Sequence, residues 1–129
     1  MLSRSEESHQ AAETLMLSRR YTGSVVAMYY SVLQRMMYVL ATDATRPISY
    51  DAQNPPDGDI HRRILSEIKI RIPNAREANN FIELFEEVLE FRKKADYQPG
   101  DITADEFVQC RKDYEGLKSR LNRFFPVKF

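Results

Sequence analysis

The stretch SVVAMYYSVLQRMMYVLA, residues 24–41, decides the fold of this chain. Its apolar residues leave almost no polar face, and Ser31, Gln34 and Arg35 are the main interruptions. A helix that is apolar around most of its circumference has to be covered on several sides, whereas a surface helix shows a single apolar stripe. We therefore predict that this segment is the buried central helix of a bundle.

A membrane span is the competing interpretation, because about 20 mainly apolar residues suffice to cross a bilayer. Gln34 and Arg35 stand in the middle of the run, and a central arginine costs at least ~2.5 kcal/mol on insertion scales. The hydroxyls of Tyr29, Tyr30 and Tyr38 also favour sites that offer a hydrogen-bond partner. We therefore expect a soluble bundle and no membrane partner.

The length and composition of the chain limit its domain organisation and the functions it can have. With 129 residues, the chain is expected to form one domain over residues 1–129 that buries a single core. Nineteen basic residues balance nineteen acidic ones, which excludes a chain-wide basic field for nucleic acid. The lone Cys110 and a beginning, MLSRSEESHQ, without an apolar signal-type core give no indication of secretion, so we expect a cytoplasmic protein.

The rest of the chain also reads as helical. A short break at Thr22-Gly23-Ser24, with Ser24 as the cap, separates a first helix from the central one. Residues 42–59 hold three prolines and no helical period, and Ile48 and Tyr50 are expected to fasten this long loop. We predict an all-α, up-and-down bundle of four or five helices, with helices at residues 3–20, 24–41, 60–72, 74–97 and 103–125.

Local signals support the last three helices. The segment IKIRI at 68–72 alternates like a strand, but nothing else in the sequence offers it a partner, so a helix ending at Pro73 is preferred. Capping boxes are predicted for Asn74 with Glu77 and for Thr103 with Glu106. In the final helix the apolar residues are spaced three, four, three, four, three, which is typical of bundle packing. They are Phe107, Cys110, Tyr114, Leu117, Leu121 and Phe124.

Few residues suggest catalysis or metal binding. Cys110 lies on the apolar seam and is expected to be a buried side chain rather than a nucleophile. Asp57, Asp59 and His61 form D-x-D-x-H, which offers oxygen and imidazole ligands to a divalent cation. A turn at Asp57-Gly58, followed by Asp59 as a helix cap, explains the same residues. We favour the cap and expect neither a metal nor a cofactor.

Basic residues cluster on two predicted helices, and phosphate contacts need this kind of density. Solvated faces and ion pairs with the neighbouring glutamates explain the clusters equally well, and no aromatic residues are interleaved with them as a stacking platform. The clusters are Arg62, Arg63, Lys69 and Arg71 on one helix, and Arg92, Lys93 and Lys94 on the next.

Two segments together resemble the HEPN family of small helical-bundle domains. The first is the helix over 24–41, with Tyr29 and Tyr30 paired ahead of aliphatic residues. The second is Arg92-Lys93-Lys94-Ala95-Asp96-Tyr97, similar to the R-x-x-A-D-Y of one HEPN branch. His61 and the long final helix follow in the same order. The resemblance implies a dimer, and many such domains are metal-independent ribonucleases of toxin–antitoxin or other defence systems.

The catalytic motif of those ribonucleases, R-x(4–6)-H near the start of the last helix, does not carry over. No histidine follows His61, so Arg92 has no partner at the required spacing. Arg4 and His9 have the spacing but lie in the wrong helix. In the family, arginine would hold the phosphate and histidine would move the proton.

Arg92, Asp96 and Tyr97 also have a purely structural interpretation. Arg92 and Asp96 are four residues apart on one helical face and are expected to pair. With Tyr97 adding a hydrogen bond, the pair would set how the fourth helix meets the fifth. We prefer this structural role to phosphate binding.

These observations lead to two functional hypotheses. The first is a non-catalytic, HEPN-like homodimer that binds RNA, a nucleotidyltransferase-type protein or an antitoxin in a defence or stress system. The alternative is a metal-independent endoribonuclease that uses Arg92, Lys93, Asp96 and Tyr97 with help from His61. A helical subunit of a larger assembly is a weaker third option.

Overall fold

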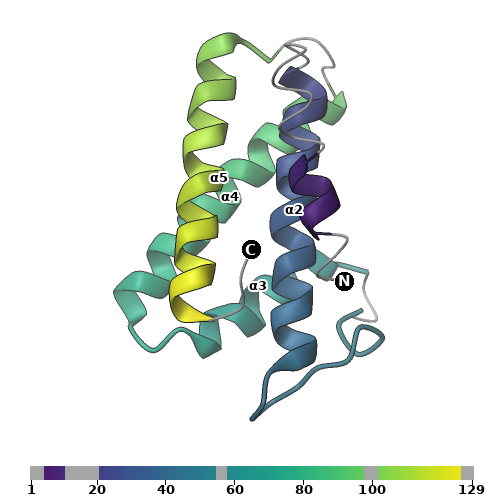
Figure 1. Ribbon diagram of the computed structural model, residues 1–129, viewed down its shortest axis with the longest axis vertical. Helices are drawn as coiled ribbons and strands as arrows, with labels where there is room; N and C mark the ends of the chain where they lie inside the picture. The colour runs from purple at the N-terminus through teal and green to yellow at the C-terminus, as the bar shows by residue number, and fades with distance from the viewer. Residues whose placement is uncertain (1–4, 11–20, 55–57, 98–101, 126–129) are drawn as a thin grey trace.

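The chain folds as an all-helical bundle (Figure 1). In this computed structural model, residues 5–10, 21–54, 58–97 and 102–125 are described. Within them there is no β-strand, so the all-α prediction is confirmed at the level of a helical bundle. Residues 5–10 are helical, and four longer helices follow: α2 (Tyr21–Thr42), α3 (Ile60–Arg71), α4 (Ala75–Tyr97) and α5 (Ala104–Phe124).

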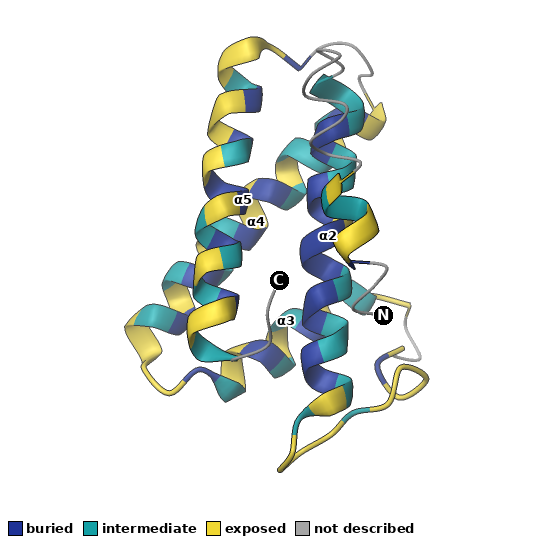
Figure 2. Cartoon of the chain, viewed as in Figure 1, coloured by how far each residue is buried: buried dark blue, intermediate teal, exposed yellow. Residues whose placement is uncertain are grey.

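Helix α2 is the central helix, as its sequence predicts. It contacts α3, α4 and α5, and the helical segment 5–10 lies against it as well (Figure 1). Buried positions run along its whole length (Figure 2). Helices α3, α4 and α5 each contribute to one apolar core around it, and the α2 members are Val25, Met28, Tyr29, Val32, Leu33, Met36, Val39 and Leu40.

The predicted break before α2 is wrong. Ser24 does not cap the helix, because α2 already includes Tyr21 and Ser24 is fully buried within it. Gly23 therefore lies inside the helix, where glycine costs about 0.5–1 kcal/mol relative to alanine. The ring of Tyr21 packs on Phe107 of α5 with 4.8 Å between centroids, which helps to hold this first turn in place. Most of the predicted helix over 3–20 lies outside the described residues.

The other helix boundaries follow their local signals. The Asp59 side chain caps α3 by accepting from Arg62 N, and IKIRI is helical up to Arg71. Thr103 and Glu106 form the predicted capping box of α5. The Asn74 side chain accepts from the backbone of α4 as expected, whereas Glu77 pairs with Arg123 of α5 at 2.8 Å.

Thr42, the first residue of the predicted 42–59 loop, ends α2, and the rest of the described loop is non-helical and is held by the side-chain amide of Gln53. The Gln53 side chain is buried and donates from Nε2 to the Met37 carbonyl at 3.0 Å and to the Ile48 carbonyl at 2.9 Å. Ile48 also donates its backbone N–H to Leu40 O, as a residue fastening the loop should. Tyr50 does less than predicted, since its side chain is 38% exposed.

Arg71 joins this loop to α3 and is not part of a free basic face. Its Nε lies 2.6 Å from Asp43 Oδ2, and its Nη1 lies 2.9 Å from Glu67 Oε2. It also donates to the Arg46 carbonyl. The basic cluster predicted on this helix is therefore reduced by one residue.

The helical segment 5–10 is attached to the bundle by polar contacts. Ser5 and Ser31 each donate their hydroxyl to the backbone carbonyl of the other, at 3.1 and 3.2 Å. Ser8 donates to Gln34, and His9 Nδ1 hydrogen-bonds the hydroxyl of buried Tyr114. Two of the polar residues that interrupt the α2 sequence, Ser31 and Gln34, thus receive this segment.

Arg35 of α2 lies in the core. Its side chain is fully buried and donates to Asn122 Oδ1 of α5 at 3.4 Å. Burial lowers the pKa of this guanidinium, while nearby Tyr38 and Glu6 oppose that change. Among the described residues, no helix combines the length and apolar character that crossing a bilayer requires.

Asp113 is a carboxylate buried where α5 meets α4. Its side chain accepts from Gln109 Nε2 at 2.9 Å, while Oδ2 has no hydrogen-bond partner in the described part of the chain. Burial raises the pKa of Asp113 to about 6, the Gln109 hydrogen bond opposes this, and the neighbouring carboxylate of Glu87 adds to it. The charged form is therefore unfavourable in the folded bundle.

We expect Asp113→Asn to stabilise the protein at pH 7.5 and to change it little at pH 4. Because the folded pKa lies above the unfolded one, the carboxyl favours folding at low pH, and this contribution is lost as pH rises through about 6. The asparagine side chain does not ionise, so the variant avoids this loss in the free energy of unfolding, which amounts to up to about 3 kcal/mol at pH 7.5. Urea unfolding at both pH values measures it, with Glu83→Gln as the exposed-carboxylate control. An equal effect at both pH values would contradict the assignment.

Candidate functional site

A pocket of about 350 Å³ lies between the start of α3 and the middle of α4. It combines a partly apolar lining with titratable and charged side chains. From α3 and its cap it receives Asp59, His61, Arg62 and Leu65, and from α4 it receives Phe85, Glu86, Leu89, Arg92 and Lys93. We take it as the candidate site because five of the residues singled out in the sequence line it.

Local helix geometry brings these side chains together. The Asp59 cap fixes the first turn of α3, so that His61 and Arg62 face α4 at the pocket. On α4, residues three and four positions apart share a face, which places Phe85, Leu89 and Arg92 along the pocket. The core residues Ile64 and Ile68 hold α3 against the bundle.

Arg92 is held by groups from two helices. Its Nε lies 2.8 Å from Asp96 Oδ2, an ion pair without hydrogen-bond alignment. Its Nη2 donates to the Tyr30 hydroxyl at 3.1 Å. Its guanidinium carbon also lies 5.2 and 5.6 Å from the ring centroids of Tyr29 and Tyr30, within range of a cation–π interaction. Arg92 therefore connects α4 to α2.

His61 is tied to the same part of α2. The Tyr29 hydroxyl contacts Nδ1 of the imidazole and lies 3.2 Å from Nε2. Burial lowers the pKa of His61, Arg92 and Lys93 lower it further, and Asp59 partly opposes them. The ring is therefore neutral at pH 7. Burial also raises the pKa of Tyr29, so its hydroxyl keeps its proton and serves as a donor.

The rim of the pocket carries both signs of charge. Arg62 and Lys93 are exposed cations, and Asp59 and Glu86 are exposed carboxylates. The Lys93 ammonium lies 3.4 Å from Glu90, a contact of two exposed side chains that contributes little to stability. Exposed ion pairs exchange readily with solvent, so Lys93 remains available to an anion.

Several residues named from the sequence lie elsewhere. Lys94 turns to α5, where it pairs with Glu106 at 2.7 Å, and Arg63 is exposed and does not line the pocket. Tyr97 is 83% exposed, and Arg92 reaches α2 through Tyr30, so the prediction that the Arg92–Asp96 pair, with a hydrogen bond from Tyr97, sets how α4 meets α5 is wrong. The predicted pairing of Arg92 with Asp96 is confirmed. Asp57 lies outside the described residues.

Sequence reasoning missed the residues that make this site a pocket. Leu65, Phe85 and Leu89 are apolar helix positions, and Phe85 is indeed in the core, so nothing in the sequence singled them out as pocket residues. Tyr29 and Tyr30 were noted for their hydroxyls and for the HEPN resemblance, but not as the residues that hold His61 and Arg92. The double tyrosine was the available signal, since one ring must face the core and its neighbour the surface. Tyr29 is indeed fully buried, and Tyr30 is 38% exposed.

Metal binding and thiol chemistry find no support in this geometry. Over the described ranges, no three histidine, cysteine, aspartate or glutamate side chains converge as metal ligands. Cys110 is buried, as its place on the apolar seam predicts, and burial raises the pKa of its thiol to about 12. A thiol held protonated in this way is a poor nucleophile.

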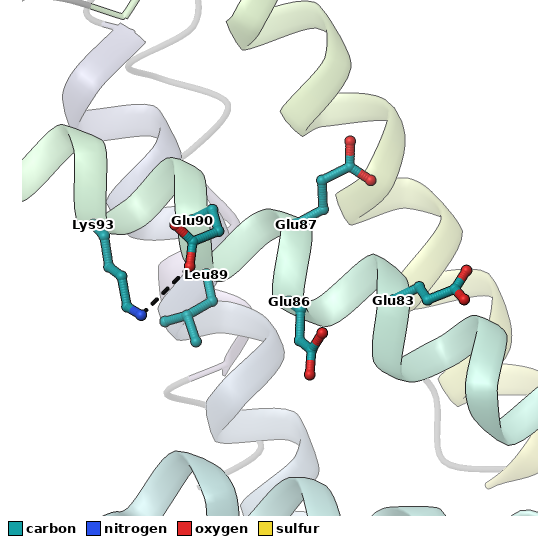
Figure 3. Close-up of a pocket in the computed structure, with 6 residues that line it drawn as sticks. All are labelled: Glu83, Glu86, Glu87, Leu89, Glu90 and Lys93. Atoms are coloured by element: carbon teal, nitrogen blue, oxygen red, sulfur yellow. Dashed lines mark hydrogen bonds and ion pairs between the residues drawn. The ribbon is translucent and has the colours of Figure 1, made fainter.

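Beside the pocket, an acidic groove of about 500 Å³ follows α4. It is lined by Glu83, Glu86, Glu87, Leu89, Glu90 and Lys93. Figure 3 shows Glu87 pointing toward α5, whereas Glu86 and Lys93 point away from it. The pocket and the groove share three lining residues, Glu86, Leu89 and Lys93, so the cations at the rim of the pocket lie next to an acidic surface.

Comparison of the chain with protein-family models, curated proteins and solved structures gives no match. The interpretation of the pocket therefore rests on its chemistry. The three cations outnumber the two lining carboxylates, Asp59 and Glu86, and together with a neutral imidazole and an apolar wall they suit an organic anion better than an uncharged ligand.

We expect the imidazole of His61 to titrate below pH 6.5. The variant Arg92→Met should raise this pKa part of the way toward 6.5. Methionine keeps an apolar stem but removes the positive charge, which is the second largest cause of the lowered pKa. Burial, the largest cause, remains, so the return is incomplete. An NMR titration of the two histidines measures this, with His9 as the internal reference. A wild-type His61 that titrates above 6.5 would contradict the described environment.

Proposed function

We propose that this protein is a HEPN-like helical domain that binds RNA without cleaving it, using the pocket between α3 and α4 to hold phosphate. The observation that carries the proposal is that Arg62, Arg92 and Lys93, which come from two helices, line one pocket together with His61. Phosphate groups are recognised by such convergent cations.

The three cations have different parts in this proposal. Arg62 and Lys93 are exposed at the rim and supply mobile positive charge to the phosphate. Arg92 is held in place by Asp96 and Tyr30, and its side chain is 23% exposed, so it offers a fixed group in the lining of the pocket. The structural role expected for Arg92 and the binding role are therefore compatible.

Binding without cleavage is favoured by the state of His61. Both ring nitrogens lie at the Tyr29 hydroxyl, so the imidazole is already a hydrogen-bond acceptor. A proton-transfer reaction on RNA needs a second group to protonate the leaving oxygen. The nearby carboxylate of Asp96 is instead paired with Arg92.

We expect Arg62→Ala and Lys93→Ala each to weaken binding of single-stranded RNA by about fivefold, because each removes a phosphate contact. Arg63→Ala changes charge equally on the same helix but away from the pocket, and should leave the affinity within about twofold. Fluorescence anisotropy at 50 and 200 mM salt measures the affinities. Equal losses in all three variants would indicate general electrostatic attraction and contradict a pocket.

An endoribonuclease is the second candidate, because His61 and Arg92 line one pocket although the sequence separates them by 31 residues. Here His61 would accept the proton of a ribose 2′-hydroxyl while Arg92 holds the phosphate. The binding reactions, resolved on a denaturing gel, test it. Cleavage by the wild type that is lost in His61→Gln would replace the binding proposal, and intact RNA leaves it standing.

Association remains the other part of the proposal, and the resemblance to HEPN domains is what supports it. The expected partners are a second copy of this chain and a nucleotidyltransferase-type or antitoxin protein. Size-exclusion chromatography with light scattering should give twice the 15.1 kDa of one chain. A monomer at working concentration would contradict the dimer.

A further inference from the structure

We propose that the pocket between α3 and α4 receives the phosphorylated end of a nucleotide chain, a terminal phosphomonoester with its own base, rather than an internal stretch of RNA. This inference rests on the proposed function and names the ligand that the site selects. Three features of the described residues carry it: the charges around the pocket, its wall and its size.

Charge limits the direction from which a polyanion reaches the site. The acidic groove lies beside the pocket over the same turns of α4, since Glu86, Leu89 and Lys93 line both, while Glu83, Glu87 and Glu90 line the groove alone (Figure 3). An RNA that ran through the pocket and on across α4 would bring its phosphates against these exposed carboxylates. Repulsion between the phosphates and these carboxylates opposes binding of an internal stretch of RNA, so binding of an RNA chain by its end is favoured.

The wall of the pocket suits a base. Half-buried Leu65 and Leu89 offer aliphatic surface from the two helices, and almost fully buried Phe85 lies behind them as part of the core. Aliphatic side chains accept the flat face of any base by dispersion, without hydrogen-bond readout. This apolar wall and the cations Arg62, Arg92 and Lys93 thus match the two halves of one nucleotide.

The size and charge of the pocket fit one terminal nucleotide that carries a phosphomonoester. A volume of about 350 Å³ lies at the small end of the range for small-molecule pockets, which runs from about 300 to 1,000 Å³. A phosphomonoester carries a charge of about −1.5 to −2 at pH 7, compared with −1 for an internal diester. Arg62, Arg92 and Lys93 therefore gain more from a terminal phosphate than from an internal one.

Three hexaribonucleotides of one sequence test the inference: one with a 5′-phosphate, one with a 3′-phosphate and one with hydroxyls at both ends. We expect at least one phosphorylated form to bind at least tenfold more tightly than the hydroxyl form. Adenosine monophosphate should compete with it, and adenosine should compete more weakly. The two phosphorylated forms show which end enters the pocket.

Two variants complete the experiment. Glu83→Gln with Glu87→Gln removes two charges that line the groove and not the pocket, and it should strengthen binding of the hydroxyl form and so narrow the difference in affinity between the phosphorylated and hydroxyl forms. Arg63→Ala should leave the preference unchanged. Equal binding of all three oligonucleotides, reduced by Arg62→Ala, would overturn the end-specific inference but retain the RNA-binding function. Binding of none of them would overturn the function itself.

Discussion

The whole bundle depends on covering α2. Most of its circumference is apolar, and burying such side chains contributes about 1.5–3 kcal/mol for each large one. One neighbouring helix covers only one stripe, so α3, α4 and α5 all pack against it, and a single core results. The site follows from this constraint, because α3 and α4 meet over α2 at the turn that carries Tyr29 and Tyr30.

The polar residues of α2 determine how its neighbours are placed. Apolar packing is non-directional, whereas a buried polar group requires a partner at a defined position. Ser31 receives the segment 5–10, Arg35 reaches Asn122 of α5, and the tyrosine pair receives His61 and Arg92. Each interruption of the apolar run thus marks a particular neighbour, and the interruption by two tyrosine hydroxyls marks the candidate site.

Sequence reasoning predicted the helices better than the site. Periodicity and capping are local, and they located α3, α4 and α5 to within a few residues. The start of α2 was misplaced because Gly23 resembles a break, while the packing of Tyr21 on Phe107, a contact between distant residues, keeps it helical. The site required knowledge of which helices meet. Tyr97 lies in the motif that resembles the HEPN family yet faces solvent, whereas Phe85 is a core residue that also lines the pocket.

The attachment of the segment 5–10 has a thermodynamic consequence of its own. It is held by the hydroxyls of Ser5 and Ser8 and the ring of His9, and water replaces such hydrogen bonds at a small net cost of about 0.5–1.5 kcal/mol each. The His9 ring also stacks on the Tyr114 ring with 5.8 Å between centroids. Compared with global unfolding, opening of this short segment breaks few interactions, so we expect the amide hydrogens of residues 5–10 to exchange through local opening.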